Sequence, residues 1–182
     1  MILMIVRLFQ VISNKLSTDL HSCNEWLIDN KLSLHVGKTE CILFGSKRKL
    51  GKIQKFEINY NGHTITGQTM VKYLGVRLDQ SLTGEAMVTQ VVSKVAGKLK
   101  FLYRYQHCLN RNLRKNLSSA LLQCHIDYCC TTWFSGLSCK WKNKLQVTQN
   151  KIVRFIHGMQ PRSHIGQVEL KRGAPQPYLS AR

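Results

Sequence analysis

The sequence VTQVVSKVAGKLKFL, residues 88–102, repeats apolar residues at the spacing of an α-helix. Its apolar positions are Val88, Val91, Val95, Leu99 and Leu102. They fall on one face of a helix with 3.6 residues per turn, and polar and basic residues occupy the rest. The pattern predicts an amphipathic helix that buries one face and presents cations to solvent.

Two further stretches toward the C-terminus have the same periodicity. The second helix is expected to bury Leu113, Leu117, Leu121, Cys124 and Tyr128, and the third Trp141, Leu145, Ile152 and Phe155. Three amphipathic helices with short connections predict a small three-helix bundle over residues 84–158. The tail, residues 159–182, contains three prolines and is expected to be loose.

Residues 14–83 have a different pattern, in which one helix precedes short strands. The segment from Asn14 to Asn30 repeats apolar residues at helical spacing, and Ser13 or Asn14 is a suitable N-cap. Alternation over residues 32–36, followed by an apolar run over residues 41–44, predicts a hairpin with Lys38 at its tip or just beyond.

A second hairpin is predicted around Asn61-Gly62, the two-residue sequence that most strongly favours a tight β-turn. Phe56, Ile58 and Tyr60 alternate before the turn, and Ile65 follows it. One further strand is expected over residues 71–78. The predicted fold class is therefore α+β, with a helix and antiparallel hairpins followed by an all-α bundle.

The charge is strongly positive and unevenly distributed. The chain has 27 Lys and Arg against 9 Asp and Glu, a net charge of +18. Residues 1–85 hold 11 basic and 7 acidic side chains, whereas residues 86–182 hold 16 and 2. Such an excess favours a polyanionic partner, and nucleic acid is favoured over an anionic membrane surface. A merely solvated basic surface is the alternative.

The cations expected to contact nucleic acid lie on the first two helices of the bundle. On a helical wheel Lys94 and Lys98 lie at the edge of the apolar stripe, and Lys100 and Arg104 lie across from it. The second helix begins with Arg111, Arg114 and Lys115. The third carries five more cations, and the scarcity of acidic neighbours distinguishes all of them from an ordinary surface.

The opening residues and the cysteines suggest an intracellular protein, nuclear or cytoplasmic and not secreted. The apolar run Met1 to Val6 is too short for a signal peptide, and no stretch is long enough to cross a membrane. The seven cysteines are expected to stay reduced. A zinc site in the His/Cys-rich region 107–139 is disfavoured, because its members lie along a predicted helix rather than on two knuckles.

Four stretches resemble the reverse transcriptase of non-LTR (LINE-type, jockey- or CR1-like) retrotransposons. They are NEWLIDNKLSLHVGKT at 24–39, KYLGV at 72–76, ALLQCHIDYCCTTW at 120–133 and QNKIVRFIHG at 149–158. The resemblance implies that residues 14–83 are the rear of a polymerase palm and residues 84–158 its thumb.

The resemblance also implies roles for particular residues. Lys38 matches the lysine of the palm's fourth motif, which would neutralise departing pyrophosphate. Tyr73, Leu74 and Gly75 match the primer grip, where backbone approaches the primer end and glycine offers no obstruction. The plainer interpretations are an exposed turn lysine and a strand glycine at a bulge.

The aspartate pair that holds two magnesium ions in the intact enzyme has no counterpart in the sequence. The resemblance places that pair on a hairpin just before residue 14, so residues 1–13, with Leu8-Phe9-Gln10, are expected to be the remnant of its second strand. A chain cut short or altered after the catalytic turn is expected to bind no cofactor of its own and to be inactive alone.

Four hypotheses about function follow. The favoured one is a partial RNA-directed DNA polymerase that retains the elements holding a primer–template duplex, RNA or DNA. The second is a host-recruited, non-enzymatic scaffold for nucleic acid or protein. The third is an enzyme whose missing polymerase segments come from another chain. The fourth is a translated pseudogene with no selected function.

Overall fold

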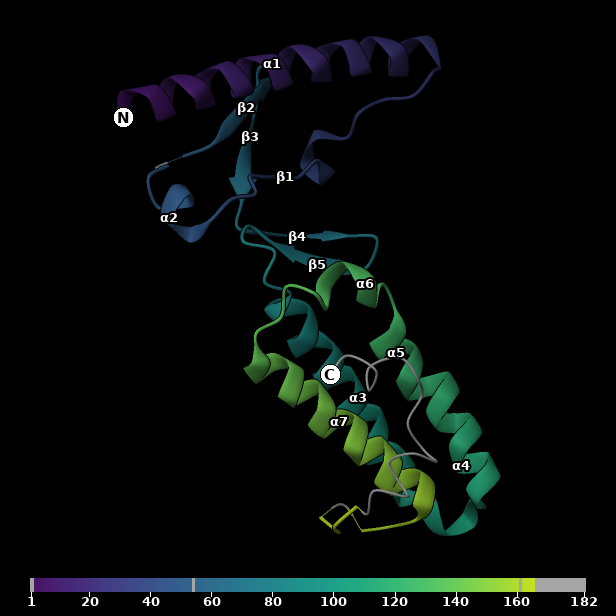
Figure 1. Cartoon of the computed structure of the whole chain (residues 1–182). Helices are drawn as coiled ribbons and strands as arrows, with labels where there is room; N and C mark the ends of the chain where they lie inside the picture. Colours follow the sequence, from purple (N-terminus) through teal and green to yellow (C-terminus); the bar gives the residue numbers. More distant parts are fainter. Residues whose placement is uncertain (1, 54, 161, 166–182) are drawn as a thin grey trace. The chain divides into compact units, whose positions relative to one another are not determined.

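The computed structural model describes residues 2–53, 55–160 and 162–165 and has a mixed α+β fold (Figure 1). The chain divides into two compact units, Met1–Leu82 and Thr83–Arg182. The first unit contains one long helix and two small sheets, and the second is helical. None of the helices in the described ranges is long and apolar enough to cross a bilayer.

The first unit begins with a single helix, α1 (Ile2–Asp29), which lies across the end of β2 and β3 (Figure 1). The predicted strand remnant at Leu8-Phe9-Gln10 is therefore wrong. Residues 1–13 contain no Gly, Pro, Asn or Asp to interrupt a helix, so the segment joins the amphipathic helix that follows it. Ser13 lies inside α1 rather than at its cap, and its Oγ donates to the Glu57 carbonyl at 2.5 Å.

Helix α1 ends close to the predicted position, through a Schellman motif. The Leu32 amide donates to the Leu27 carbonyl at 2.8 Å, and the Lys31 amide donates to the Ile28 carbonyl at 2.9 Å. Lys31 has a φ of +57°, in the left-handed region that glycine usually occupies at this position. The helix is thus terminated by backbone hydrogen bonds without the usual glycine.

The hairpin predicted over residues 32–44 is absent from this described stretch. A 3₁₀ turn, η1 (Val36–Lys38), leads into a two-residue strand, β1 (Cys41–Ile42). Strand β1 pairs in parallel with Gly67-Gln68 rather than with residues 32–36. The Thr39 side chain closes the turn by donating to the His35 carbonyl at 3.1 Å, and the preceding alternating residues form no strand. A one-turn helix, α2 (Lys47–Leu50), follows.

The hairpin predicted at Asn61-Gly62 is confirmed. Strands β2 (Glu57–Tyr60) and β3 (His63–Gln68) are antiparallel, and Tyr60 pairs with His63. Asn61 and Gly62 have φ values of +45° and +77°, as a type I′ turn requires. The side chains of Phe56, Ile58, Tyr60 and Ile65 are buried, and the Tyr60 hydroxyl donates to the buried Asn24 side chain of α1.

The single strand predicted over residues 71–78 is wrong, because this stretch forms a second hairpin. Strands β4 (Met70–Tyr73) and β5 (Val76–Asp79) are antiparallel and are joined by Leu74-Gly75. The turn has φ values of +46° and +85°. Leucine is rare in the left-handed region, so the sequence lacked the Asn or Asp that usually signals such a turn.

The second unit packs helices α3 and α7 together, with α4 and α5 alongside (Figure 1). Its elements are α3 (Glu85–Arg104), the 3₁₀ turn η2 (Gln106–Cys108), α4 (Arg111–Ser118), the π-helical turn η3 (Ser119–Gln123), α5 (Cys124–Asp127), α6 (Cys130–Trp133) and α7 (Cys139–His157). All five predicted core residues of α3 are buried. On α7, Leu145, Ile152 and Phe155 are buried and Trp141 is half-buried.

The stripe predicted for the second helix of the bundle is wrong. Leu113, Leu121 and Tyr128 are exposed, whereas Leu122 and Ile126 are buried. The π turn η3 inserts one extra residue between α4 and α5. The residues after the turn are therefore rotated about the helix axis relative to the positions that a regular helical period predicts. Cys129, with a φ of +48°, then separates α5 from α6.

Two glycines fix the ends of the helical unit. Gly84 precedes α3 with a φ of +70°, and a Cβ there would lie 2.5 Å from the Trp133 carbonyl oxygen. Gly158 ends α7 with a φ of +71° in a second Schellman motif, in which the Met159 amide donates to the Arg154 carbonyl at 2.9 Å. The predicted loose tail falls mainly on residues 166–182, which lie outside the described residues.

Candidate nucleic-acid interface

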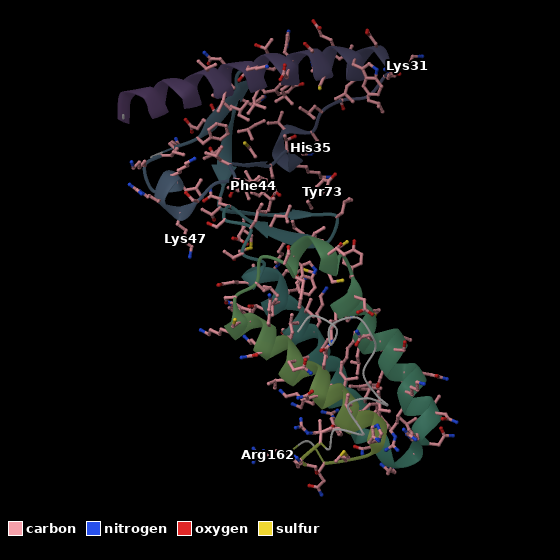
Figure 2. All side chains as sticks on the ribbon, viewed as in Figure 1. Lys31, His35, Phe44, Lys47, Tyr73 and Arg162 are labelled. Carbon is pink, nitrogen blue, oxygen red and sulfur yellow. The ribbon has the colours of Figure 1, made fainter. Side chains whose placement is uncertain are left out.

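The three residues matched to a primer grip lie at the turn of the β4–β5 hairpin. Tyr73 and Leu74 are 65% and 72% exposed, and Tyr73 lies at the turn end of β4 (Figure 2). The left-handed conformation of Leu74 costs about 1–2 kcal/mol relative to a relaxed backbone. The hairpin therefore presents a strained apolar tip to solvent.

The same hairpin carries a cationic pair that the sequence interpretation missed. Lys72 and Arg77 are directly opposite each other in the β4–β5 register, and both are exposed. Like charges at such cross-strand positions are destabilising unless an anion compensates them. Recognising the Leu74-Gly75 turn would have revealed the pair, because a two-residue turn places 72 opposite 77.

Lys38 is exposed at the end of the η1 turn, between α1 and β1. Its amide donates to the His35 carbonyl at 3.0 Å, and the Thr39 amide donates to the Val36 carbonyl at 3.0 Å. The backbone of the turn is thus hydrogen-bonded while the Lys38 side chain extends to solvent. This lysine is available to an anion, but no carboxylate site is built around it in the residues that the structure describes.

The four cations predicted on α3 are all exposed and form two pairs. At 100° per residue, Lys94 and Lys98 lie within 40° of each other, as do Lys100 and Arg104, and the two pairs face roughly 120° apart. Nitrogen-tipped side chains surround the helices of this unit (Figure 2). A rigid duplex that contacts one pair would therefore not contact the other in the same way.

His125, on α5, lies beside the first of these pairs. Burial lowers the pKa of its imidazole, and the positive charges of Lys98 and Lys94 lower the pKa further. Its Nε2 atom is inaccessible to solvent and has no hydrogen-bond partner in the structure. Packing of α5 against α3 thus adds a neutral imidazole to the Lys94–Lys98 pair at neutral pH.

Of the three cations in the first turns of α4, two are exposed and one is packed against another helix. Asn110 caps α4 by accepting from the Leu113 amide at 2.8 Å, and Arg111 and Lys115 are exposed. Arg114 is half-buried, with its guanidinium against Gly158 at the C-terminal end of α7. A cation is favourable beside the carbonyls that end a helix, so this arginine has a structural environment that Arg111 and Lys115 lack.

Two cations of α7 lie over aromatic rings. The Lys142 Nζ atom lies 5.4 Å from the centre of the Phe134 ring, and the Lys144 Nζ atom lies 4.5 Å from the centre of the Trp141 ring. Such contacts hold an ammonium group in place while leaving its outer side hydrated. The positive charge of this helix is therefore partly ordered near its N-terminal end.

A cationic loop in the first unit also escaped the sequence interpretation. The segment 47–55, KRKLGKIQK, carries five cations in nine residues, and Lys47 is labelled on α2 in Figure 2. Lys55 forms an ion pair with Glu57 at 2.6 Å, whereas Lys47, Arg48, Lys49 and Lys52 are exposed. Leu50 and Ile53 of the same loop line a recess of about 280 Å³ with Phe56. The charge count for residues 1–85 as a whole did not reveal that five of the cations lie in this short segment.

The carboxylates do not fit the two-magnesium centre of the polymerase family. Asp19 and Asp29 lie on α1, Asp79 on β5 and Asp127 on α5. The Asp127 carboxylate accepts a hydrogen bond from the side-chain Nε2 atom of Gln123 at 2.7 Å. Throughout residues 2–53, 55–160 and 162–165, no three His, Cys, Asp or Glu side chains lie together as a metal site requires.

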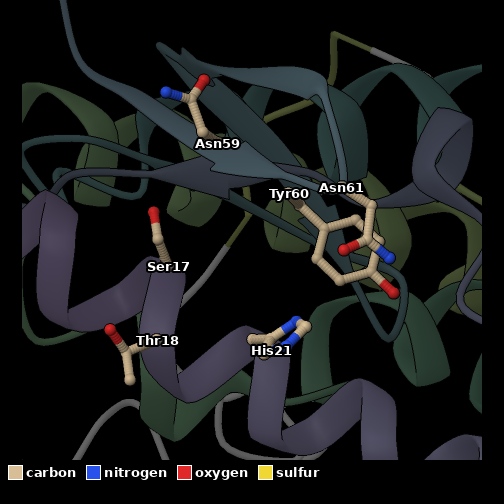
Figure 3. A pocket seen from close by; sticks show the side chains of 6 residues that line it. All are labelled: Ser17, Thr18, His21, Asn59, Tyr60 and Asn61. Atoms are coloured by element: carbon tan, nitrogen blue, oxygen red, sulfur yellow. The ribbon is translucent and has the colours of Figure 1, made fainter.

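A polar recess of about 310 Å³ lies between α1 and the end of β2 (Figure 3). Ser17, Thr18 and His21 line it from α1, and Asn59, Tyr60 and Asn61 line it from the hairpin. The Ser17 and Thr18 hydroxyls donate to carbonyls one turn earlier in α1. Apart from His21, which lies 3.9 Å from the Glu25 carboxylate, the side chains that line the recess are uncharged.

Comparison of the chain with protein-family models, with curated proteins and with solved structures gives no match.

Proposed function

We propose that the chain is a reverse-transcriptase-like segment of retrotransposon origin that binds the backbone of a primer–template duplex. In this proposal residues 14–83 correspond to the rear of a palm and residues 84–158 to a thumb. The role is to hold nucleic acid, and no step of phosphoryl transfer is assigned to this chain.

One observation carries the proposal, namely the unbalanced positive charge on the faces of the helical unit. Between residues 86 and 165 the only acidic residue is Asp127, whose carboxylate is engaged by Gln123. The ion pairs His21–Glu25 and Lys55–Glu57 both lie in the first unit. Phosphates are the ligand class that such a surface attracts, largely without regard to base sequence.

The β4–β5 tip and Lys38 are assigned secondary roles in the same proposal. The exposed tip at Tyr73 and Leu74, with Lys72 and Arg77 behind it, would approach the primer strand. Lys38 would stand near a phosphate. Both assignments come from the resemblance, and the exposure of these side chains is what makes them accessible to a ligand.

The proposal is tested by filter binding of the full chain to duplexes of unrelated sequence over a range of salt concentrations. Each neutralised phosphate contributes about −0.9 to the slope of log affinity against log salt, so four contacts give a slope of about −3.6. Equal affinity for unrelated sequences together with a steep slope supports the proposal. A slope near zero contradicts it.

A non-enzymatic scaffold for a protein partner is the second candidate. It is favoured by the exposed apolar side chains of Leu113 on α4 and Leu121 in the π turn η3. Exposed apolar groups beside cations suit an acidic, amphipathic partner. Tight binding to polyglutamate with weak binding to duplex would favour the scaffold, and the reverse result would favour the nucleic-acid proposal.

A further inference from the structure

Two aromatic rings at the end of α3 are exposed and in contact with each other. Phe101 and Tyr105 are 57% and 50% exposed, and their ring centres lie 5.2 Å apart at 56°. Five other apolar residues of the same helix, from Val88 to Leu102, are buried. The aromatic pair therefore lies outside the buried face of the helix and is exposed to solvent.

The aromatic pair continues the line of the first cationic pair. Lys94, Lys98, Phe101 and Tyr105 are spaced by four, three and four residues, which places them on one stripe of the helix. At 1.5 Å per residue, Phe101 lies about 4.5 Å beyond Lys98 along the axis and Tyr105 about 6 Å further. The stripe thus changes from cations to rings over about 16 Å.

We propose that this stripe binds single-stranded nucleic acid, with phosphates at Lys94 and Lys98 and unpaired bases stacked on Phe101 and Tyr105. The inference goes beyond the proposed function: it rests on the same phosphate-binding charge but assigns this stripe to an unpaired segment of nucleic acid. Surfaces that bind single strands combine cations, which contact the phosphate backbone, with aromatic rings, on which bases of any type can stack.

The two halves of the stripe require a single strand rather than a duplex. Bases inside a duplex are stacked on each other and offer no face to a protein ring, so Phe101 and Tyr105 would gain nothing from a duplex. His125 adjoins the cationic end and carries no negative charge in either protonation state.

The test compares binding of the full chain to fluorescein-labelled oligothymidylate of about 20 nucleotides and to a duplex of equal length. Phe101→Ala and Tyr105→Ala should each weaken oligothymidylate binding by about 5- to 100-fold and change duplex binding less than about twofold. The double variant Lys94→Gln/Lys98→Gln should weaken both, because it removes phosphate contacts.

Three further variants keep the result specific to ring stacking. Phe101→Tyr should retain oligothymidylate binding and Phe101→Leu should lose it, although both keep an apolar group at the site. Trp26→Ala removes a 61% exposed aromatic from α1, outside the stripe, and should leave binding unchanged. Thermal midpoints measured alongside identify any variant that fails to fold.

The outcomes separate this inference from the proposed function. Steep salt-dependent duplex binding, with oligothymidylate binding unaffected by Phe101→Ala and Tyr105→Ala, overturns the stripe alone. Failure to bind either nucleic acid overturns both. Loss of binding in Phe101→Leu together with retention in Phe101→Tyr supports the stripe.

Discussion

The two units of the chain are of similar length, but fewer buried apolar side chains are found from residue 11 to Leu82 than in the described part of Thr83–Arg182. Five apolar side chains are buried among residues 11–53 and 55–82, and fifteen among residues 83–160 and 162–165. Because burial of apolar area supplies most of the free energy of folding, the helical unit should be the more stable of the two. The difference makes the helical unit the better platform for precisely placed side chains.

The units also carry their charge differently. In the first unit, five cations lie within one short loop, 47–55, and most of the remaining charge is balanced. In the second unit, the cations are spread over three helices, and Glu85 and Asp127 are the acidic residues between positions 83 and 165. A ligand of the first unit would therefore meet one concentrated patch, whereas a ligand of the second would meet an extended array.

The largest expected effect is on the core of the helical unit. Phe155 is fully buried and packs edge-on against Tyr103, with ring centres 5.4 Å apart. Phe155→Ala should lower the free energy of unfolding by about 3–5 kcal/mol, from lost burial and the cavity left behind. Phe56→Ala, in the thinner core, should cost less. Denaturant unfolding followed by circular dichroism measures both, and equal losses would contradict the comparison.

A smaller effect is expected from the backbone position that begins α3. Gly84→Ala should lower the free energy of unfolding by about 1–3 kcal/mol, because the new Cβ meets the Trp133 carbonyl and the left-handed backbone resists a side chain. Gly97→Ala is the matched control. A Cβ at Gly97, in the middle of α3, meets nothing within 4 Å, so that variant should stabilise the helix by about 0.5–1 kcal/mol. Thermal denaturation of the two variants should therefore shift in opposite directions.

The sequence predicted the elements whose local pattern agrees with their packing. Helices α3 and α7 and the Asn61-Gly62 hairpin were all found, because periodicity and turn chemistry specify them within a few residues. The α+β class followed from the same patterns. These elements also position much of the candidate interface, including the exposed cations of α3.

The elements that the sequence did not predict depend on distant contacts or on unusual residues. The partner of β1 lies 26 residues further along the chain, at Gly67, so alternation near residue 34 gave no guide to it. The β4–β5 turn uses leucine where Asn or Asp is usual, and the π turn rotated a stripe that a regular helix would have buried. The Lys72–Arg77 pair was hidden by the same missed turn.

Neutralising the loop of the first unit tests whether its concentrated charge takes part in binding. Replacing Lys47, Arg48, Lys49 and Lys52 with Gln should reduce the salt slope of duplex binding by up to about 3.6, if each contacts one phosphate. Because these four side chains are exposed, their replacement should change the free energy of unfolding little. Lys15→Gln, an exposed cation on α1, is the control and should leave the slope unchanged. An unchanged slope in the loop variant would exclude this loop from the binding surface.

The smallest expected effect is a pH dependence that belongs to the helical unit. The pKa of His125 is lowered in the folded chain by burial, then by Lys98 and Lys94, from its usual 6.5. The unfolded chain therefore takes up this proton more readily. The stability associated with the neutral imidazole is complete above pH 6.5 and is lost as the pH falls toward the lowered pKa. The thermal midpoint of unfolding should therefore decrease as the pH is lowered from about 7.5 to about 5.

Assignment of that decrease to His125 requires a difference between variants, because the chain contains seven histidines. His125→Gln should flatten the pH dependence, whereas His21→Gln should not, since His21 is exposed on α1 beside Glu25. Double replacement of Lys94 and Lys98 with Gln should weaken the dependence without abolishing it, because burial is the larger cause of the lowered pKa. If His125→Gln and His21→Gln behave alike, the imidazole is not held beside the two lysines, and α5 does not pack against α3 as described.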